Sequence, residues 1–156
     1  MCWDGLSHKA QTALSEAIAV ATERGHCEII SLHILRALLD REDSVLIGIL
    51  NHVGSQHEQV RAALEEAMNH VPRPERPPET ISMSEELDAL ISRGWNVAQR
   101  LGDTRLDAAH LLLSMVDSHT DLGGAILREQ RVSVLMLTCF VLQWRQTQGH
   151  DRAWGG

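Results

Sequence analysis

Apolar side chains recur at helical spacing along this chain, and no stretch shows the alternation or turn pairs of a β-hairpin. Between Ala10 and Ala21 an apolar residue returns every three or four positions, which places these side chains on one face of a helix. Ser7 precedes the segment as an N-cap residue, and Gly25 follows it as a C′ glycine. The pattern predicts a helix from Ser7 to about Arg24.

Three more short helices are predicted before residue 70. Ser31 and Asp43 are expected to cap two of them, and Gly54 ends the second. Ser55 with Glu58 forms the S-x-x-E pattern of a capping box for the third.

The four prolines all lie between residues 72 and 78, in the segment VPRPERPPET. Proline removes an amide donor and disfavours helix in the residue before it, so residues 71–82 are predicted to form an extended connector. The connector divides the chain into segments 5–70 and 83–147, followed by a tail at 148–156.

These two segments are similar to each other when the sequence is shifted by 77 residues. Ten positions between residues 7 and 50 are then identical without a gap. The matched pairs are Ser7 and Ser84, Ser15 and Ser92, Val20 and Val97, Ala21 and Ala98, Gly25 and Gly102, His33 and His110, Leu35 and Leu112, Asp40 and Asp117, Ile49 and Ile126, and Leu50 and Leu127. The period predicts two copies of a four-helix unit. Neither copy can bury all its apolar faces alone, so we expect an all-α domain of eight helices packed with pseudo-twofold symmetry.

The repeat changes the interpretation of His110, which stands at the head of a leucine run. His33 holds the same place in the first copy. A single catalytic residue needs no internal duplicate, whereas a scaffold residue at a recurring helix start does. We therefore expect the His110 ring to pack between helices and bond a backbone group.

Composition and charge narrow the classes of partner. The chain has 14 Lys and Arg against 21 Asp and Glu, a formal net charge of −7, and no basic cluster to bind phosphates, so neither nucleic acid nor an anionic membrane is an expected partner. The longest strongly apolar run, residues 132–144, is too short to span a bilayer. Three widely spaced cysteines, Cys2, Cys27 and Cys139, predict no disulfide framework. Together with the lack of a signal-peptide pattern at the N-terminus, this favours a cytoplasmic location.

Five motifs occur in an order that resembles a known family. They read LSHKAQTALSEA, RGHCEIISLHILRALLD, NHVPRP, SEELDALI and LGDTRLDAAHLLLSMV. This series is similar to the double-repeat N-terminal domain of the Clp chaperone ATPases over roughly residues 5–147. Within that family the likeness is greatest to the ClpB disaggregase branch, on the residues SLH at 31–33 and the Gly102-Asp103 turn. Trp95, within the first predicted helix of the second repeat, resembles a tryptophan of the ClpV unfoldase branch of type VI secretion.

The resemblance implies a docking module for unfolded or aggregated protein segments, or for an adaptor protein. It implies an AAA+ ATPase module acting in the same chain or in another one. The alternatives are a ClpV-like module that grips one helical peptide and a stand-alone Clp-repeat adaptor or competitor. In ClpC relatives a glutamate before each repeated histidine helps to bind phosphorylated arginine; Leu32 and Ala109 stand there in this chain, so that property is not carried over.

The resemblance also points to an apolar groove beside the starts of the first helix and of the second repeat's helices. Its predicted lining is Ser7, Leu14, Ile91, Trp95, Ala109 and His110. Ordinary core packing is the alternative for Leu14 and Ile91. Trp95 is large and rarely fully buried, which favours a contact role for it.

No catalytic, metal or cofactor site is predicted. The glycine pairs, at 123–124 and 155–156, do not precede Lys-Ser or Lys-Thr, so the sequence lacks the P-loop pattern. The nine histidines show no H-x-x-x-H spacing, and the cysteines show no C-x-x-C spacing. The sequence therefore lacks the usual ligand spacing of a zinc site.

The segment 133–146 is apolar on nearly every face of a predicted helix. Val134, Leu137 and Val141 form one stripe, and Met136, Phe140 and Trp144 form another. If one stripe faces the core, the other is exposed. Met136, Phe140 and Trp144 are therefore predicted as a second contact surface, for self-association or for a partner, unless the C-terminal tail covers them.

Overall fold

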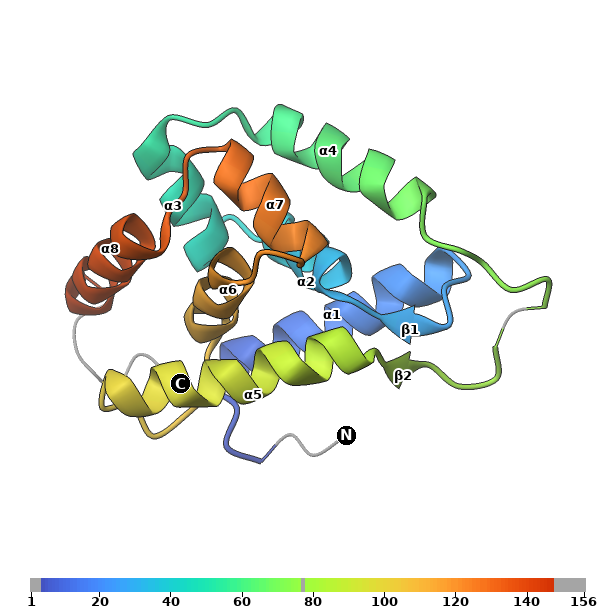
Figure 1. Cartoon of the computed structure of the whole chain (residues 1–156), viewed down its shortest axis with the longest axis horizontal. Helices are drawn as coiled ribbons and strands as arrows, with labels where there is room; N and C mark the ends of the chain where they lie inside the picture. Colours follow the sequence, from blue (N-terminus) through green and yellow to red (C-terminus); the bar gives the residue numbers. More distant parts are fainter. Residues whose placement is uncertain (1–3, 77, 148–156) are drawn as a thin grey trace.

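A computed structural model describes residues 4–76 and 78–147; the predicted tail and Cys2 lie outside these residues. The described residues form eight helices and two short strands (Figure 1). In chain order these are α1 (His8–Glu23), β1 (Glu28–Ile29), α2 (Ser31–Leu39), α3 (Val45–Val53), α4 (His57–Asn69), β2 (Ser82–Met83), α5 (Glu85–Arg100), α6 (Ala108–Asp117), α7 (Leu122–Glu129) and α8 (Val134–Thr147). None of the helices in this part of the chain is long and apolar enough to cross a membrane.

The helices repeat with the period that the sequence predicts. α1 and α5, α2 and α6, α3 and α7, and α4 and α8 each begin 77 residues apart. The all-α architecture of two four-helix repeats is therefore confirmed. In Figure 1, α5 crosses the view at the bottom with α1 behind it, and α2 and α6 lie above at the centre.

The two repeats interlock through their third helices. α3 of the first repeat packs on α6 and α8 of the second, and α7 of the second packs on α2 and α4 of the first. One continuous cluster of buried apolar residues runs through both repeats, from Leu6 to Val141. The core is thus shared, which is why neither repeat can bury its apolar faces alone.

Two short parallel strand contacts also cross between the repeats. β1 pairs with β2 through Ile29 and Met83, and an isolated bridge joins Leu6 to Leu106 at the equivalent positions. The next amides continue each ladder. Ser84 N–H donates to the Ile29 carbonyl at 3.1 Å, and Ser7 N–H donates to the Leu106 carbonyl at 2.8 Å. The start of each repeat's first helix is therefore fixed beside the start of the other repeat's second helix.

Capping of the first helix of each repeat follows the sequence. Ser7 Oγ accepts from Ala10 N–H at 3.1 Å, and Ser84 Oγ accepts from Leu87 N–H at the same distance. Gly25, at φ +71°, lies just beyond α1 in the left-handed region that glycine favours.

Three predicted caps are wrong by one position each. Ser44, not Asp43, caps α3, because its hydroxyl accepts from Ile47 N–H at 3.2 Å. Ser31 is the first residue inside α2 rather than its cap. Gln56 precedes α4, and the Ser55 hydroxyl bonds the Gln130 side chain of the other repeat instead of forming a capping box.

The repeated histidines replace a side-chain cap at α2 and α6. His33 Nδ1 accepts from Ile30 N–H at 3.0 Å, and His110 Nδ1 accepts from Asp107 N–H at 2.8 Å. Both rings are fully buried. The scaffold interpretation of the two histidines is therefore confirmed.

The second ring nitrogen has a different partner in each repeat. His110 Nε2 lies 2.8 Å from Asp103 Oδ2, whereas His33 Nε2 lies 2.8 Å from Nδ1 of His26, at the position that Asp103 occupies in the second repeat. Burial, together with the charges of His26 and Arg24, lowers the pKa of His33 to about 4. Burial and Arg24 also lower the pKa of His26.

Stability should fall with acidity because of this histidine pair. His33 has a pKa of about 4 in the folded chain against 6.5 when unfolded, so the unfolded chain binds more protons between these values. The contribution of His33 to the free energy of unfolding is complete above pH 6.5 and is lost as the pH falls to 4. The expected loss is roughly 3 kcal/mol over the window, at about 1.4 kcal/mol per pKa unit. Urea denaturation at several pH values measures it.

The matched control is His26→Asp, which gives His33 the carboxylate partner that His110 already has. This variant should raise the pKa of His33 and flatten the pH dependence of its unfolding free energy. An unchanged slope in His26→Asp would contradict the assignment.

Close packing of α7 on α6 requires glycine at position 124. A Cβ there would lie 2.0 Å from the Met115 carbonyl oxygen, which is backbone and cannot move aside. Gly124→Ala should lower the free energy of unfolding by about 3 kcal/mol or more. Gly54→Ala is the control, since nothing lies within 4 Å of its Cβ and only its φ of +75° opposes alanine, at a cost of about 1 to 2 kcal/mol. Equal losses in the two variants, measured by urea denaturation, would refute the close contact.

Candidate functional site

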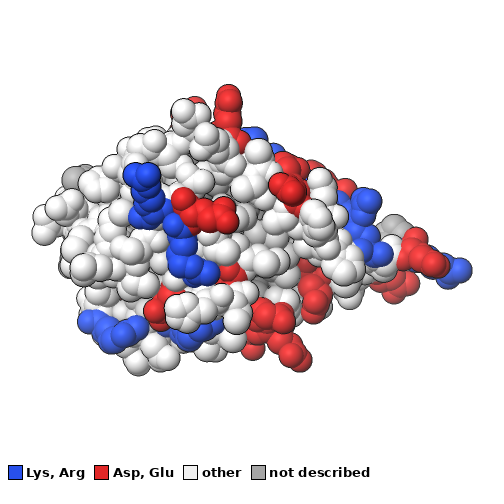
Figure 2. Space-filling model, turned by 45° about the horizontal axis from the view of Figure 1, so that its top comes forward, with Lys and Arg blue, Asp and Glu red and all other residues white. Residues whose placement is uncertain are grey.

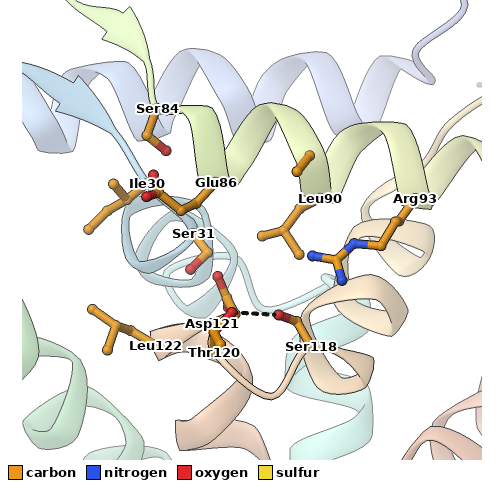
Figure 3. A pocket seen from close by; sticks show the side chains of 11 residues that line it. Ile30, Ser31, Ser84, Glu86, Leu90, Arg93, Ser118, Thr120, Asp121 and Leu122 are labelled. Carbon is orange, nitrogen blue, oxygen red and sulfur yellow. Dashed lines mark hydrogen bonds between the residues drawn. The ribbon is translucent and has the colours of Figure 1, made fainter.

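A pocket of about 420 Å³ opens where the first repeat meets the second (Figure 3). It lies between the start of α2, one side of α5 and the turn from α6 into α7. The residues that line it are Ile30, Ser31, Ser84, Glu86, Ala89, Leu90, Arg93, Ser118, Thr120, Asp121 and Leu122.

Three helix starts converge on this pocket. α2 begins at Ser31, α5 follows its cap Ser84, and α7 follows its cap Asp121, whose Oδ2 accepts from Gly124 N–H at 2.8 Å. The first turns of helices carry N–H groups without partners in their own helix, and the caps satisfy only some of them. The pocket wall is therefore built from first turns of helices of both repeats.

The pocket depends on a close approach of α7 to α2. A Cβ at Gly123 would lie 2.8 Å from Leu35 Cδ1 and 3.0 Å from the Ser31 hydroxyl. With glycine at this position, α7 lies directly against the first turn of α2. Leu122 then stands at the rim with 56% of its surface exposed.

Two charged side chains at the pocket are free to meet a ligand. Arg93 and Glu86 project from α5 at different ends of the pocket (Figure 3). Both are exposed, and among the described residues neither side chain forms a hydrogen bond or an ion pair. Leu90, fully buried, forms the floor between them. The arrangement combines an apolar floor with the cation of Arg93 and the carboxylates of Glu86 and Asp121.

The predicted groove residues do not form one surface. Ser7, Leu14, Ala109 and His110 are all buried in the core. Ile91 and Trp95 are half-buried on the other flank of α5, and the Trp95 ring lies over Gly5, where a Cβ would be 2.8 Å from its Cη2. The core alternative for Leu14 therefore holds, and Ile91 and Trp95 are the members of the predicted set that a ligand can reach.

Ser7 links the two repeats through its side chain. The Ser7 hydroxyl donates to Asp107 Oδ1 across the two repeats while accepting from Ala10 N–H. Burial raises the pKa of the Asp107 carboxyl. The Ser7–Asp107 hydrogen bond therefore ties the start of α1 to the start of α6. Among the described residues, no group of three or more His, Cys, Asp or Glu side chains is placed to hold a metal ion.

The exposed face of α8 differs from the prediction. Leu137 and Val141 are buried as expected, but Phe140 and Trp144 pack against α3, where a Cβ at Gly48 would lie 3.0 Å from the Phe140 ring. Met136 is half-buried as well. The exposed large apolar side chains of α8 are Val134, Leu135 and Leu142, and Cys139 is exposed as well.

Sequence reasoning missed Arg93, Glu86, Asp121 and Leu122 as site residues. One signal is present in the sequence, because the Gly123-Gly124 pair comes soon after Asp121, a residue type that caps helices. Gly123 packs against α2 of the other repeat and Gly124 against α6, and no local pattern in the sequence reveals these contacts.

Comparison with known proteins places this architecture in a family. Residues 5–130 match the family described as the Clp repeat (R) N-terminal domain. The chaperone protein ClpB of Pseudomonas putida is 29% identical over 126 residues, which cover 81% of this chain and 15% of that protein.

Two solved structures share the fold. The crystal structure of the Hsp104 N-terminal domain from Candida albicans superposes with a TM-score of 0.80 at 16% identity, covering 97% of this chain and 99% of that one. A complex of a ClpV N-domain with a VipB peptide superposes with a TM-score of 0.64 at 23% identity, covering 72% and 68%. The chain thus spans only a small part of the length of its curated relative, and it belongs to the Clp repeat N-terminal domain family.

Proposed function

We propose that this domain binds segments of other polypeptides for a Clp-type AAA+ ATPase, and that the pocket between α2, α5 and α7 receives them. The observation that carries the proposal is the pocket itself. It joins an apolar floor at Leu90, an exposed leucine at Leu122 and unpaired charges at Arg93 and Glu86. The role is binding rather than catalysis, and any ATP hydrolysis belongs to an ATPase module in the same or another chain.

The pocket chemistry suits extended polypeptide. Backbone N–H groups of the helix starts can donate to peptide carbonyl oxygens, which are common to every sequence. The apolar floor takes one large side chain, and Arg93 and Glu86 can pair with charges on either side of it. Recognition of this kind favours unfolded segments over a single defined sequence.

A second candidate binding site is the opposite flank of α5, at Ile91 and Trp95. These half-buried apolar side chains are four residues apart on one helix face and would take an apolar segment or a helical peptide. The complex of a ClpV N-domain with a VipB peptide supports a peptide partner in general. A single tight helical ligand at this flank would favour the ClpV-like alternative.

Leu122→Glu tests the pocket. A fluorescein-labelled peptide that is unfolded in solution should bind the variant at least about tenfold more weakly, because the charge replaces the exposed apolar contact at the rim. Fluorescence anisotropy gives the dissociation constants, and circular dichroism checks that the variant is folded.

Leu135→Glu is the matched control, since Leu135 is an exposed leucine on a different helix. It should leave the affinity within about twofold of the wild type. If Trp95→Ala weakens binding while Leu122→Glu does not, the peptide binds at the Ile91 and Trp95 flank. If no variant changes the affinity, the peptide binds at neither site and both assignments are contradicted.

A further inference from the structure

α8 carries an apolar stripe that no part of the described chain covers. Three of the four large apolar side chains that are exposed in the described residues lie on this helix, with Leu135 at 75%, Leu142 at 41% and Val134 at 39%. Cys139 is also exposed. Leu135, Cys139 and Leu142 are spaced at i, i+4 and i+7, so they run along one line of the helix surface.

The same positions in the first repeat are polar. α4 is the counterpart of α8, and Glu58 and Glu65 stand where the second repeat has Leu135 and Leu142. Glu65 is bound to Arg24 and Arg36, so the first repeat satisfies this face within its own chain. In the second repeat both acids are replaced by leucine, and the equivalent partners are absent.

α8 is also nearly free of charge. Its sequence VLMLTCFVLQWRQT contains one charged residue, Arg145, whereas α4 contains four. On the face drawn in Figure 2, few acidic side chains appear at the left end, where α8 lies in Figure 1. Since each chain has a formal net charge of −7, this is the face where two copies can approach with little repulsion.

We propose that the stripe on α8 pairs with the same stripe of a second copy of this chain. Leu135 and Leu142 are equidistant from the midpoint between Thr138 and Cys139. A twofold axis at that midpoint, with the two α8 helices antiparallel, sets each Leu135 against the Leu142 of the other copy and brings the two Cys139 side chains together. A stripe that matches itself under a twofold axis is what an isologous interface requires.

Sedimentation equilibrium over a range of concentrations tests the pairing. The contact is small, so we expect a weak dimer, with a dissociation constant on the order of 100 µM. Leu135→Glu restores the acid of the first repeat and should weaken the dimer at least about tenfold. Leu122→Glu, which removes the exposed leucine of α7, should leave it unchanged. A wild-type chain that remains monomeric at about 500 µM, or an equal effect of both variants, overturns the proposal.

Cys139 gives a second readout of the geometry. In a Cys2→Ser, Cys27→Ser background, mild oxidation of the concentrated protein should produce a disulfide-linked dimer through Cys139. Adding Leu135→Glu should abolish that product while Cys139 still reacts with a small maleimide. A dimer that sediments normally but never cross-links through Cys139 would place the interface elsewhere and refute the proposed axis. These measurements do not involve peptide binding, so they stand or fall separately from the proposed function.

Discussion

The architecture depends on two equivalent hydrogen bonds that cross between the repeats. Ser7 N–H donates to the Leu106 carbonyl, and Ser84 N–H donates to the Ile29 carbonyl. Each bond joins the cap of one repeat's first helix to the segment that leads into the other repeat's second helix. Buried backbone groups must find partners, and here the partner of each repeat is supplied by the other. The crossing fixes how the two repeats face each other, and the shared core follows from it.

The candidate pocket is a product of this exchange. α7 belongs to the second repeat but lies against α2 of the first, so the pocket has walls from both. Gly123 allows that approach, because a side chain there would meet Leu35 of α2, while Gly124 lets α7 pack on the Met115 backbone of α6. A domain formed from one repeat would have neither the core nor the pocket.

The two repeats keep one backbone plan and differ in chemistry. At the brace of the second helix, Asp103 partners His110, whereas His26 partners His33. Asp107 and Ile30 occupy equivalent positions before the second helix of each repeat. Asp107 accepts a hydrogen bond from the Ser7 hydroxyl, whereas Ile30 has no side-chain acceptor for Ser84, whose hydroxyl caps α5. On the fourth helix, the acids of α4 give way to the leucines of α8. Each difference preserves the backbone fold and changes either an exposed surface or a titrating pair. A duplicated unit can acquire distinct surfaces in this way while both copies keep the same fold.

By itself the sequence determined the helices, the period and the family. Helical spacing, Ser7, Gly25 and the shift of 77 residues are local or repetitive signals, and each describes a property that survives in the folded chain. The duplicated histidine also predicted its own scaffold role. The predicted caps at Asp43 and Ser55 are incorrect because several polar residues compete for the cap at each helix start. At Ser55 the other repeat also takes part, since the Ser55 hydroxyl bonds the Gln130 side chain.

Only the tertiary structure decided which apolar faces are covered. α8 is apolar all round, so its sequence cannot say which stripe faces the core; the approach of α3 covers Phe140 and Trp144 and leaves Leu135 and Leu142 open. Likewise, Leu14 and Ile91 look alike in the sequence, yet one is buried and the other half-exposed. Periodicity fixes the direction of a side chain relative to its own helix. Burial depends on which distant helix arrives there, and that is set by contacts between the repeats.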